Sequence, residues 1–594
     1  MKMVNITING NAVSAPAGKT ILQAARQAGI YIPTLCEHPA LESIGACRMC
    51  VVEVTGQRNL QAACVFPITE GMEVLTETPR VDKARKLVLD MIFSERNHYC
   101  MYCEASGDCE LQALGYRYGL DHFVYTTYSA SFGLDASRKD FIMEQNRCVL
   151  CSRCIRACSD LVANHTLGLR RRGAKSMVHA DANVPFGESS CIECGTCMQV
   201  CPTGALFDKR SAFMGRDTQV EHVKSTCGQC SIGCSMDIVT RGGNVLRVDG
   251  DWDGAVSGGL LCKMGRFNPL YDKRERITTP LIRKKGKLEE ATWSAALQAV
   301  AKEMGRTDAA QMGVLTSSFA TNEALYLLDA VFRKEMKVKS RGLLNDTAPA
   351  LSKKPAGKLT DIGKSDVILV IGADPAADQP VASFFVKRAV DKGARLIVVD
   401  GPENGLAPFA YSTLSMNEIA KAVATAARAD APFVLYGAGV TKQAAAELKK
   451  LEGKASFVAL SPGANTYAAA AFGFNGSFKP ESLSFLYILQ GEQKWDGEDI
   501  LPKLDKKVFT VVQASFESPA TAQADVVLPM AIWSERSGSV TNTEGTVQKC
   551  SQAVKPLGEA KADWDILSML AAKLGQKAGK SLEDITAQAV KELN

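Results

Sequence analysis

The chain lacks a long apolar stretch, and it lacks an export signal. A helix that crosses a bilayer needs about 20 consecutive, mostly apolar residues, and no segment of this sequence provides them. The opening residues, MKMVNITING, contain neither an apolar signal core nor a twin arginine. We therefore expect a cytoplasmic protein without direct membrane insertion.

The chain also has only a small net charge and few histidines. The formal net charge is only +5 over 594 residues, which is too small an excess to favour nucleic acid as a partner. Six histidines, no Walker loop and no serine-histidine-aspartate pattern leave no candidate catalytic residue. The segment Gly437-Ala438-Gly439 lacks the third glycine of a dinucleotide loop, so we expect an ordinary turn there.

Cysteine is nearly absent from the second half of the chain but abundant in the first. Of 20 cysteines, 19 precede residue 263 in tight groups, and only Cys550 follows. In a cytoplasmic chain, such groups indicate metal binding rather than disulfides. We expect no role for Cys550.

Two equivalent cysteine runs lie between residues 148 and 201. Each has the spacing C-x2-C-x2-C-x3-C, and the second ends in Cys-Pro. The first three thiolates of a run hold three corners of a cubane, while the fourth cysteine lies too far round the following helix and ligates the other cluster. The repeat resembles the bacterial two-cluster ferredoxin, here over residues 138–212. The two [4Fe-4S] ligand sets are then Cys148, Cys151, Cys154 and Cys201, and Cys158, Cys191, Cys194 and Cys197. A pair of zinc sites is the alternative.

Residues 1–80 read as strand, Asn9-Gly10 turn, strand, and a helix capped by Thr20. With the cysteines that follow, this resembles a β-grasp [2Fe-2S] ferredoxin domain. The cysteine spacing is similar to the longer-looped version in complex I, iron-only hydrogenases and NAD-linked formate dehydrogenases. The resemblance implies four [2Fe-2S] ligands, and a zinc ribbon is the alternative: Cys36, Cys47, Cys50 and Cys64.

Residues 81–125 begin with a helix predicted over 81–93 and contain three closely spaced cysteines. Three thiolates do not complete a four-iron cluster. In the families just named, a histidine before the first cysteine is the fourth ligand, and the short H-x-C spacing here resembles the diaphorase subunit of NAD-reducing nickel-iron hydrogenases. The alternative is that His98 only caps the helix. The implied [4Fe-4S] ligands are His98, Cys100, Cys103 and Cys109.

Residues 220–275 contain a C-x2-C-x3-C-x27-C pattern that resembles the small iron-sulfur domain of molybdopterin oxidoreductases. The implied [4Fe-4S] ligands are Cys227, Cys230, Cys234 and Cys262. One [2Fe-2S] and four [4Fe-4S] clusters require twenty ligands, and His98 plus the 19 grouped cysteines supply twenty.

Residues 276–594 alternate buried-looking apolar runs with helical patterns, which predicts doubly wound α/β domains. The segments 371–376, 524–529 and 541–545 resemble the IG-x-NPA, ADVVLP and TNTEG motifs of molybdopterin oxidoreductases. At the position that binds the metal in that family, the nearest match offers only Asp346 and no thiolate. The chain ends about 50 residues after residue 545, so we expect no closing carboxy-terminal domain and no molybdopterin.

The sequence thus predicts a multidomain α/β protein that moves single electrons and has no catalytic site of its own. The resemblance implies an iron-sulfur subunit of a soluble multi-subunit NAD(P)H-linked oxidoreductase of the hydrogenase, formate dehydrogenase or flavin-based bifurcating type. The implied partners are a flavoprotein with FMN, an NAD(P)H site and an iron-sulfur cluster, a thioredoxin-like [2Fe-2S] subunit, a hydrogenase or formate dehydrogenase module, and ferredoxin. Two alternatives are a catalytic molybdenum or tungsten formate dehydrogenase α subunit, with the metal at Asp346, and the G subunit of complex I, the NADH-quinone oxidoreductase.

Overall fold

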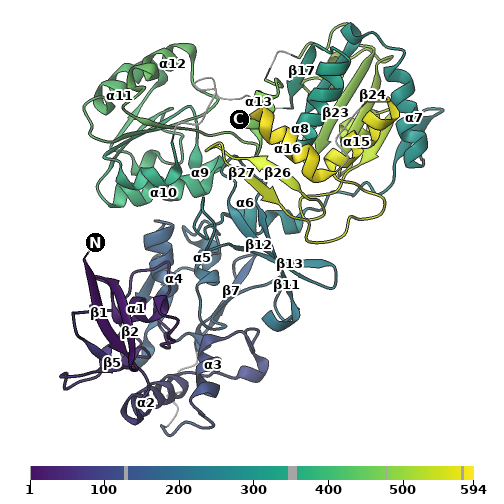
Figure 1. Cartoon of the computed structure of the whole chain (residues 1–594). Coiled ribbons are helices and arrows are strands. Elements are labelled where there is room, and N and C mark those ends of the chain that lie inside the picture. Colours follow the sequence, from purple (N-terminus) through teal and green to yellow (C-terminus); the bar gives the residue numbers. More distant parts are fainter. Residues whose placement is uncertain (1, 126–131, 345–356, 476–477, 577–580, 594) are drawn as a thin grey trace. The chain divides into compact units, whose positions relative to one another are not determined.

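The computed structural model describes residues 2–125, 132–344, 357–475, 478–576 and 581–593 (Figure 1). It divides into two compact units, Met1–Glu221 and His222–Asn594. Within the described residues, no helix is both long enough and apolar enough to cross a membrane. The multidomain α/β fold expected from the sequence is confirmed.

The first unit opens with a β-grasp domain. A sheet of order β2-β1-β5-β3-β4 packs against α1, and its hairpin turns at Asn9 and Gly10, both at positive φ. Thr20 caps α1 by accepting a hydrogen bond from the Gln23 amide, as its sequence position predicts. The elements are β1 Met3–Ile8, β2 Asn11–Pro16, α1 Ile21–Gln27, β3 Val51–Val54, β4 Gln61–Ala62 and β5 Glu73–Leu75.

Two helices follow, α2 (Pro79–Glu95) and α3 (Glu110–Arg117). The α2 helix begins two residues earlier than predicted, because Thr78 caps it and Pro79 occupies its first position. Buried side chains of both helices share a small core with Leu35 and Met49 of the β-grasp domain.

The ferredoxin-like part of the first unit is built from short elements. A sheet of order β10-β7-β6 and a separate hairpin, β8-β9, surround two one-turn helices. The bounds are β6 Leu134–Asp135, β7 Phe141–Glu144, α4 Arg153–Arg156, β8 Leu167–Arg170, β9 Met177–Ala180, α5 Thr196–Gln199 and β10 Leu206–Asp208.

The second unit begins with a small sheet of order β11-β12-β13 and the one-turn helix α6. The loop between β11 and β12 carries Cys227, Cys230 and Cys234, and Cys262 directly precedes α6. A hairpin late in the chain, β26-β27, also belongs to this unit. The bounds are β11 Glu221–Thr226, β12 Ser235–Arg241, β13 Asn244–Gly250, α6 Lys263–Arg266, β26 Gly538–Thr541 and β27 Val547–Cys550.

A seven-stranded sheet of order β15-β14-β25-β24-β23-β16-β17 forms the larger core. From β25 to β17 the strands are parallel, and all but the edge strand β17 are largely buried, which explains why apolar residues predominate in them. The bounds are β14 Leu281–Lys284, β15 Lys287–Glu290, α7 Trp293–Met304, β16 Met312–Thr316, α8 Asn322–Leu328, β17 Ser340–Leu343, α13 Thr466–Ala471, β23 Phe485–Gly491, β24 Phe509–Ala514, α14 Pro519–Gln523, β25 Val526–Pro529, α15 Asp563–Lys573 and α16 Leu582–Leu593.

A five-stranded parallel sheet of order β20-β19-β18-β21-β22 is inserted between β17 and β23. Helices α11 and α12 cover one face of it, and α10 covers the other (Figure 1). The bounds are β18 Val367–Ile371, α9 Pro375–Asp378, α10 Pro380–Asp391, β19 Arg395–Val399, β20 Ser412–Leu414, α11 Ile419–Ala426, β21 Pro432–Tyr436, α12 Lys442–Leu448 and β22 Ser456–Ala459. The doubly wound α/β character predicted for this half is confirmed.

Candidate metal centres

The four cysteines of the β-grasp domain lie together in two close pairs. The Cys36 amide donates to the Cys47 sulfur at 3.4 Å, and the Cys47 amide donates to the Cys36 sulfur at the same distance. A hydrogen bond between the two thiols lowers the pKa of Cys36 to about 6, and Cys50 likewise lowers the pKa of Cys64. We call these four residues the β-grasp set.

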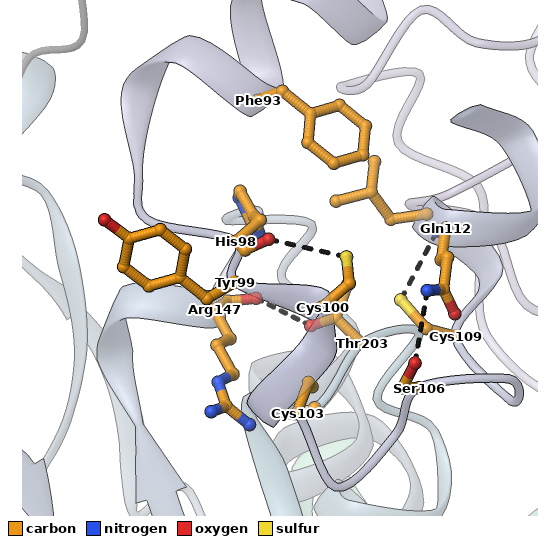
Figure 2. A pocket seen from close by; sticks show the side chains of 12 residues that line it. Phe93, His98, Tyr99, Cys100, Cys103, Ser106, Cys109, Gln112, Arg147 and Thr203 are labelled. Atoms are coloured by element: carbon orange, nitrogen blue, oxygen red, sulfur yellow. Dashed lines mark hydrogen bonds between the residues drawn. The ribbon is translucent and has the colours of Figure 1, made fainter. Parts of the chain in front are cut away.

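His98 and its three neighbouring cysteines line one cavity. Figure 2 shows the sulfurs of Cys100 and Cys109 facing the same space near Phe93. Burial, with a smaller contribution from Arg96, lowers the pKa of His98 to about 4, so the imidazole is neutral at pH 7. We call these four residues the His98 set.

The hydrogen bonding of His98 is compatible with a metal ligand. Its Nε2 is buried and has no hydrogen-bond partner among the described residues, while the backbone of Ile92 hydrogen-bonds to the ring. A backbone carbonyl that accepts from one ring nitrogen leaves a lone pair on the other, which is the usual arrangement of a ligating histidine. A histidine that only capped α2 would not need a buried ring nitrogen with a free lone pair.

The ferredoxin-like domain contains two further cavities, and each gathers the cysteines predicted to share a cluster. One cavity is lined by Cys148, Cys151, Cys154 and Cys201, the Cys148 set. The other cavity is lined by Cys158, Cys191, Cys194 and Cys197, the Cys191 set. In both, the fourth cysteine of one run crosses over to the cavity of the other run.

The two runs also share their backbone conformation. In the first, Leu150 and Ser152 have positive φ, and in the second the equivalent Glu193 and Gly195 do. The Leu150 amide donates to the Cys148 sulfur at 3.4 Å, and the Glu193 amide donates to the Cys191 sulfur at 3.4 Å. Backbone amides directed at thiolate sulfurs are a means by which proteins set iron-sulfur potentials.

The second unit holds the remaining cysteines, Cys227, Cys230, Cys234 and Cys262, which are all buried. We call them the Cys227 set. A β-carbon on Gly265 would stand 2.8 Å from the Cys227 sulfur, so this helix must approach the set with a glycine. The segment that resembles TNTEG, and Gln548 shortly after it, pack on the loop between these cysteines. The Thr543 backbone amide donates to the Ser231 carbonyl at 2.7 Å, and the Gln548 side-chain nitrogen donates to the Gly233 carbonyl at 2.8 Å.

Sequence reasoning missed the groups that connect the sites of the first unit. Arg153, buried beside the Cys148 set, forms a bidentate ion pair with Glu110 of α3, with distances of 2.6 and 2.8 Å. Arg156 donates to the backbone carbonyls of Glu42 and Cys36. Thr203 lines both the His98 cavity and the Cys148 cavity. The sequence signal that could have indicated these contacts was the presence of arginines inside a cysteine run, because a buried arginine needs a hydrogen-bond acceptor.

The surroundings of these sets are compatible with iron-sulfur clusters. Among the described residues, no group of three or more His, Cys, Asp or Glu side chains is found that could hold one metal ion. Three of the sets instead surround cavities. Burial raises the pKa of Cys151 to about 12 and of Cys148 to about 11, so their thiolate forms require a cationic centre between them.

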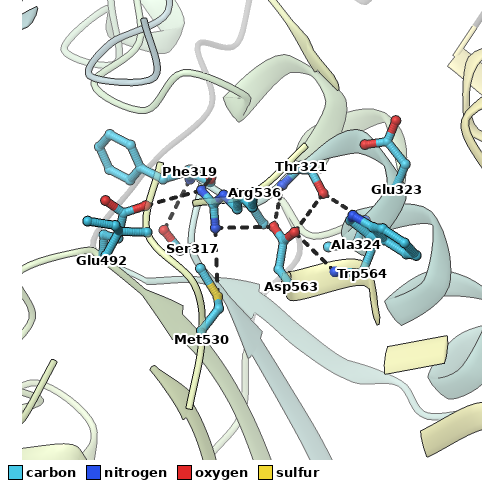
Figure 3. Close-up of polar contacts among 12 residues, drawn as sticks. Ser317, Phe319, Thr321, Glu323, Ala324, Glu492, Met530, Arg536, Asp563 and Trp564 are labelled. Atoms are coloured by element: carbon cyan, nitrogen blue, oxygen red, sulfur yellow. Dashed lines mark hydrogen bonds and ion pairs between the residues drawn. The ribbon is translucent and has the colours of Figure 1, made fainter. Parts of the chain in front are cut away.

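Doubly wound α/β proteins bind ligands at the carboxyl edge of their sheet. The binding point lies between two neighbouring strands whose following connections run towards opposite ends of the sheet. That point lies between β16 and β23. Figure 3 shows it filled by Arg536, whose guanidinium is 3.4 Å from Glu492 and 3.5 Å from Asp563 and donates to the Phe319 carbonyl. A buried cation that is already paired with Asp563 does not offer an unpaired positive charge to an anionic cofactor. Asp346, the only sequence candidate for a molybdenum ligand, lies outside the described residues.

Family models match consecutive parts of the chain. They are a 2Fe-2S iron-sulfur cluster binding domain over residues 1–79, the NADH-ubiquinone oxidoreductase-G iron-sulfur binding region over 85–123 and a 4Fe-4S dicluster domain over 147–205. The second unit matches the molybdopterin oxidoreductase Fe4S4 domain over 220–271 and molybdopterin oxidoreductase over 276–573.

Curated relatives include G subunits of NADH-quinone oxidoreductases. The G subunit of Rickettsia felis is 28% identical over 99% of this chain and 90% of its own length. The second G subunit of Rhizobium meliloti is 31% identical over 65% of this chain, which spans only 46% of that relative. Among solved structures, an NAD+-reducing [NiFe]-hydrogenase is 36% identical, with a TM-score of 0.34, over 36% of this chain and 90% of that one.

The last family model covers half of the chain, and the cluster-domain models precede it in the order that the sequence predicts. The expected family resemblance is therefore confirmed. The chain belongs to the molybdopterin oxidoreductase family, as a member that resembles the G subunit of NADH dehydrogenases and carries one 2Fe-2S and several 4Fe-4S cluster-binding domains ahead of the oxidoreductase region.

Proposed function

We propose that this chain is the electron-wiring subunit of a cytoplasmic multi-subunit oxidoreductase fed by NAD(P)H. In this proposal it relays single electrons between a flavoprotein partner and a second redox partner or ferredoxin, and it has no catalytic site of its own. The observation that carries it is the contiguity of the sites: Thr203 borders two cavities, and Arg156 joins the ferredoxin-like domain to the β-grasp set.

The cysteine and histidine sets would hold one [2Fe-2S] and four [4Fe-4S] clusters, each of which takes up and releases one electron at a time. The proposed domains remain 1–80, 81–125, 138–212, 220–275 and 276–594. Around the clusters the chain supplies the ligands, the amides directed at sulfur and the burial that excludes water. His98, a neutral ligand in place of a thiolate, removes one negative charge from its site.

The partners follow from what the chain does not itself supply. A set of one-electron centres needs a flavin to split the electron pair of NAD(P)H. The proposed neighbours are an FMN and NAD(P)H-binding iron-sulfur flavoprotein, a thioredoxin-like [2Fe-2S] subunit, and a hydrogenase or formate dehydrogenase module. We propose that no molybdopterin is bound, and the internally neutralised Arg536 supports this.

The G subunit of an NADH-quinone oxidoreductase is the second candidate. The similarity to the Rickettsia felis protein along 99% of the chain favours it. The Cys191 set favours the first candidate, because the complex I subunit keeps only one cubane in the equivalent region. Co-purification with membrane subunits and quinone reduction would decide for complex I.

The deciding experiment is metal analysis of the complex purified from its own organism without oxygen. Two irons in one cluster and four in each of four others predict eighteen irons for this chain, after subtraction of the partners' clusters. Near-stoichiometric molybdenum or tungsten on this chain would contradict the electron-relay proposal and identify the chain as a catalytic formate dehydrogenase subunit. Zinc in place of iron would exclude both the electron-relay function and the formate dehydrogenase function.

A further inference from the structure

The hairpin β8-β9 carries an unusual concentration of positive charge at its turn. Arg170, Arg171, Arg172 and Lys175 lie within six residues, and no acidic residue occurs from Leu161 to Ala180. All but the half-buried Arg170 are exposed. We call these four residues the basic tip.

The basic tip is not neutralised by the chain itself. Within the described residues, none of its four side chains makes a hydrogen bond or an ion pair, whereas Arg153 pairs with Glu110 and Arg156 donates to two backbone carbonyls. Arg171 moreover has a φ of 65°, a conformation that is uncommon for residues other than glycine. Four unpaired cations on one turn repel each other, so this arrangement favours an external anionic partner.

The strands below the tip reach both cluster cavities of the ferredoxin-like domain. Leu167 of β8 lines the cavity of the Cys191 set, and Val178 of β9 lines the cavity of the Cys148 set. Two contacts hold the hairpin in place: Arg96 donates to the Ser176 carbonyl, and the Gln145 side chain donates to the Val178 carbonyl. A molecule bound at the tip is therefore coupled through a fixed hairpin to both cavities.

Apolar side chains are exposed on the same part of the domain. Leu169, next to the tip, is 54% exposed, and Ile192, which lines the Cys191 cavity, is 38% exposed. Exposed apolar residues beside a charged rim are typical of protein interfaces. Nucleic acid or a lipid surface would use the positive charge alone and would not need a redox centre beneath it.

We propose that the basic tip is the docking site of a small acidic iron-sulfur carrier protein of the ferredoxin type, which exchanges electrons with the Cys191 set. The inference rests on the relay function proposed above and adds to it a surface and the sign of the partner's charge. In each encounter one electron passes between the carrier's cluster and the cluster held by this chain. One is oxidised and the other reduced by one electron, and no proton or covalent bond moves.

The test compares two triple variants of the complete complex. In one, Arg170, Arg171 and Arg172 are changed to Gln, and in the matched control Lys19, Lys83 and Lys86, exposed residues of the first unit, are changed to Gln. The probe is a strongly acidic two-[4Fe-4S] ferredoxin, and its association rate and affinity are measured on a biosensor without turnover. We expect the tip variant to bind about tenfold more slowly at about 50 mM salt, with the difference disappearing at about 0.5 M salt.

A second measurement does not depend on the variants. Ferredoxin whose carboxylates have been amidated should bind the unmodified complex as weakly as native ferredoxin binds the tip variant. Equal binding of native ferredoxin to both triple variants would overturn the docking proposal. So would tip-dependent binding of phosphatidylglycerol vesicles or single-stranded RNA without binding of ferredoxin.

The two proposals fail in different ways. If NAD(P)H still reduces all clusters of the complex but ferredoxin binding does not depend on the basic tip, only the docking proposal is wrong. If the unmodified chain contains no reducible clusters, the relay itself is wrong. Iron content and cluster spectra of both triple variants should equal those of the unmodified complex, because the substituted side chains are not ligands.

Discussion

The guanidinium of Arg156 donates a hydrogen bond to the backbone carbonyl of Cys36, so the helix α4, inside one cubane cysteine run, holds the loop of another cluster site. The same guanidinium donates to the Glu42 carbonyl and is buried. A planar, always charged group can satisfy two carbonyls at once, which explains an arginine at this position.

Replacement of Arg156 by Gln should weaken the β-grasp set. Hydrogen bonds from a charged donor are worth about 1.5–3 kcal/mol, and two carbonyls would lose theirs. The loss of the [2Fe-2S] visible absorption should therefore occur at lower urea concentration, with the [4Fe-4S] signals nearly unchanged. Arg156→Lys keeps the charge but not the fork, so full restoration by lysine would contradict the role of geometry.

His98 can be tested by changing the ligand type. His98→Cys should retain a four-iron cluster whose reduction potential falls by on the order of 100 mV, because a thiolate adds one negative charge. His98→Ala should lose one iron and give a three-iron signal. Redox-titrated electron paramagnetic resonance measures both, and an unchanged potential in the cysteine variant would mean that another group is the fourth ligand.

Glu492 should make the second unit sensitive to pH. Burial raises its pKa to about 7, and Arg536 only partly opposes this, whereas an unfolded glutamate titrates near about 4.3. Between these values the folded state binds more protons, so stability should fall as pH rises from about 4 to about 7. Glu492→Gln should remove this slope and leave the unit more stable above pH 7 by on the order of 3 kcal/mol.

The measurement is urea unfolding at several pH values, followed by tryptophan fluorescence. All five tryptophans follow residue 222, so the signal reports the second unit alone. Glu498→Gln, an exposed neighbour, should leave the profile unchanged. A Glu492→Gln variant with the slope of the parent protein would show that this carboxyl is not the group responsible.

Two glycines near the Cys227 set form a matched pair. An alanine β-carbon at Gly265 would stand 2.8 Å from the Cys227 sulfur, whereas at Gly228 it would meet nothing within 4 Å. Gly265→Ala should therefore reduce the iron content by about four per chain, and Gly228→Ala should not. Equal iron in both variants would contradict the assignment of this set.

The short-range features of the chain were predictable from the sequence. The crossing of cysteines between the two ferredoxin cavities follows from spacing within each run, and the buried strand Val367–Ile371 follows from its uninterrupted apolar residues. Thr20 and Gln23, which form the capping box, also lie within one helical turn of each other. Each of these depends on residues that are close in sequence.

The missed features depend on contacts between distant residues. Arg156 meets Cys36 across 120 positions, and Glu492, which follows β23, meets Arg536, which precedes β26. The Gln548 side chain meets Gly233 across 315 positions. No local pattern encodes such pairs. Asp346 lies outside the described residues, so its proposed alternative role stays a prediction.

The contact of residues 542–548 with the Cys227 set has a consequence for biosynthesis. The loop that carries Cys230 and Cys234 receives hydrogen bonds from side chains 310 and 315 positions further along the chain. At roughly 5–20 residues per second, those partners leave the ribosome about 15–60 s after the cysteines do. The four sets of the first unit lie within residues 36–201 and do not wait for them. Cluster delivery to the nascent protein is thus expected in two stages, with the second unit loaded last.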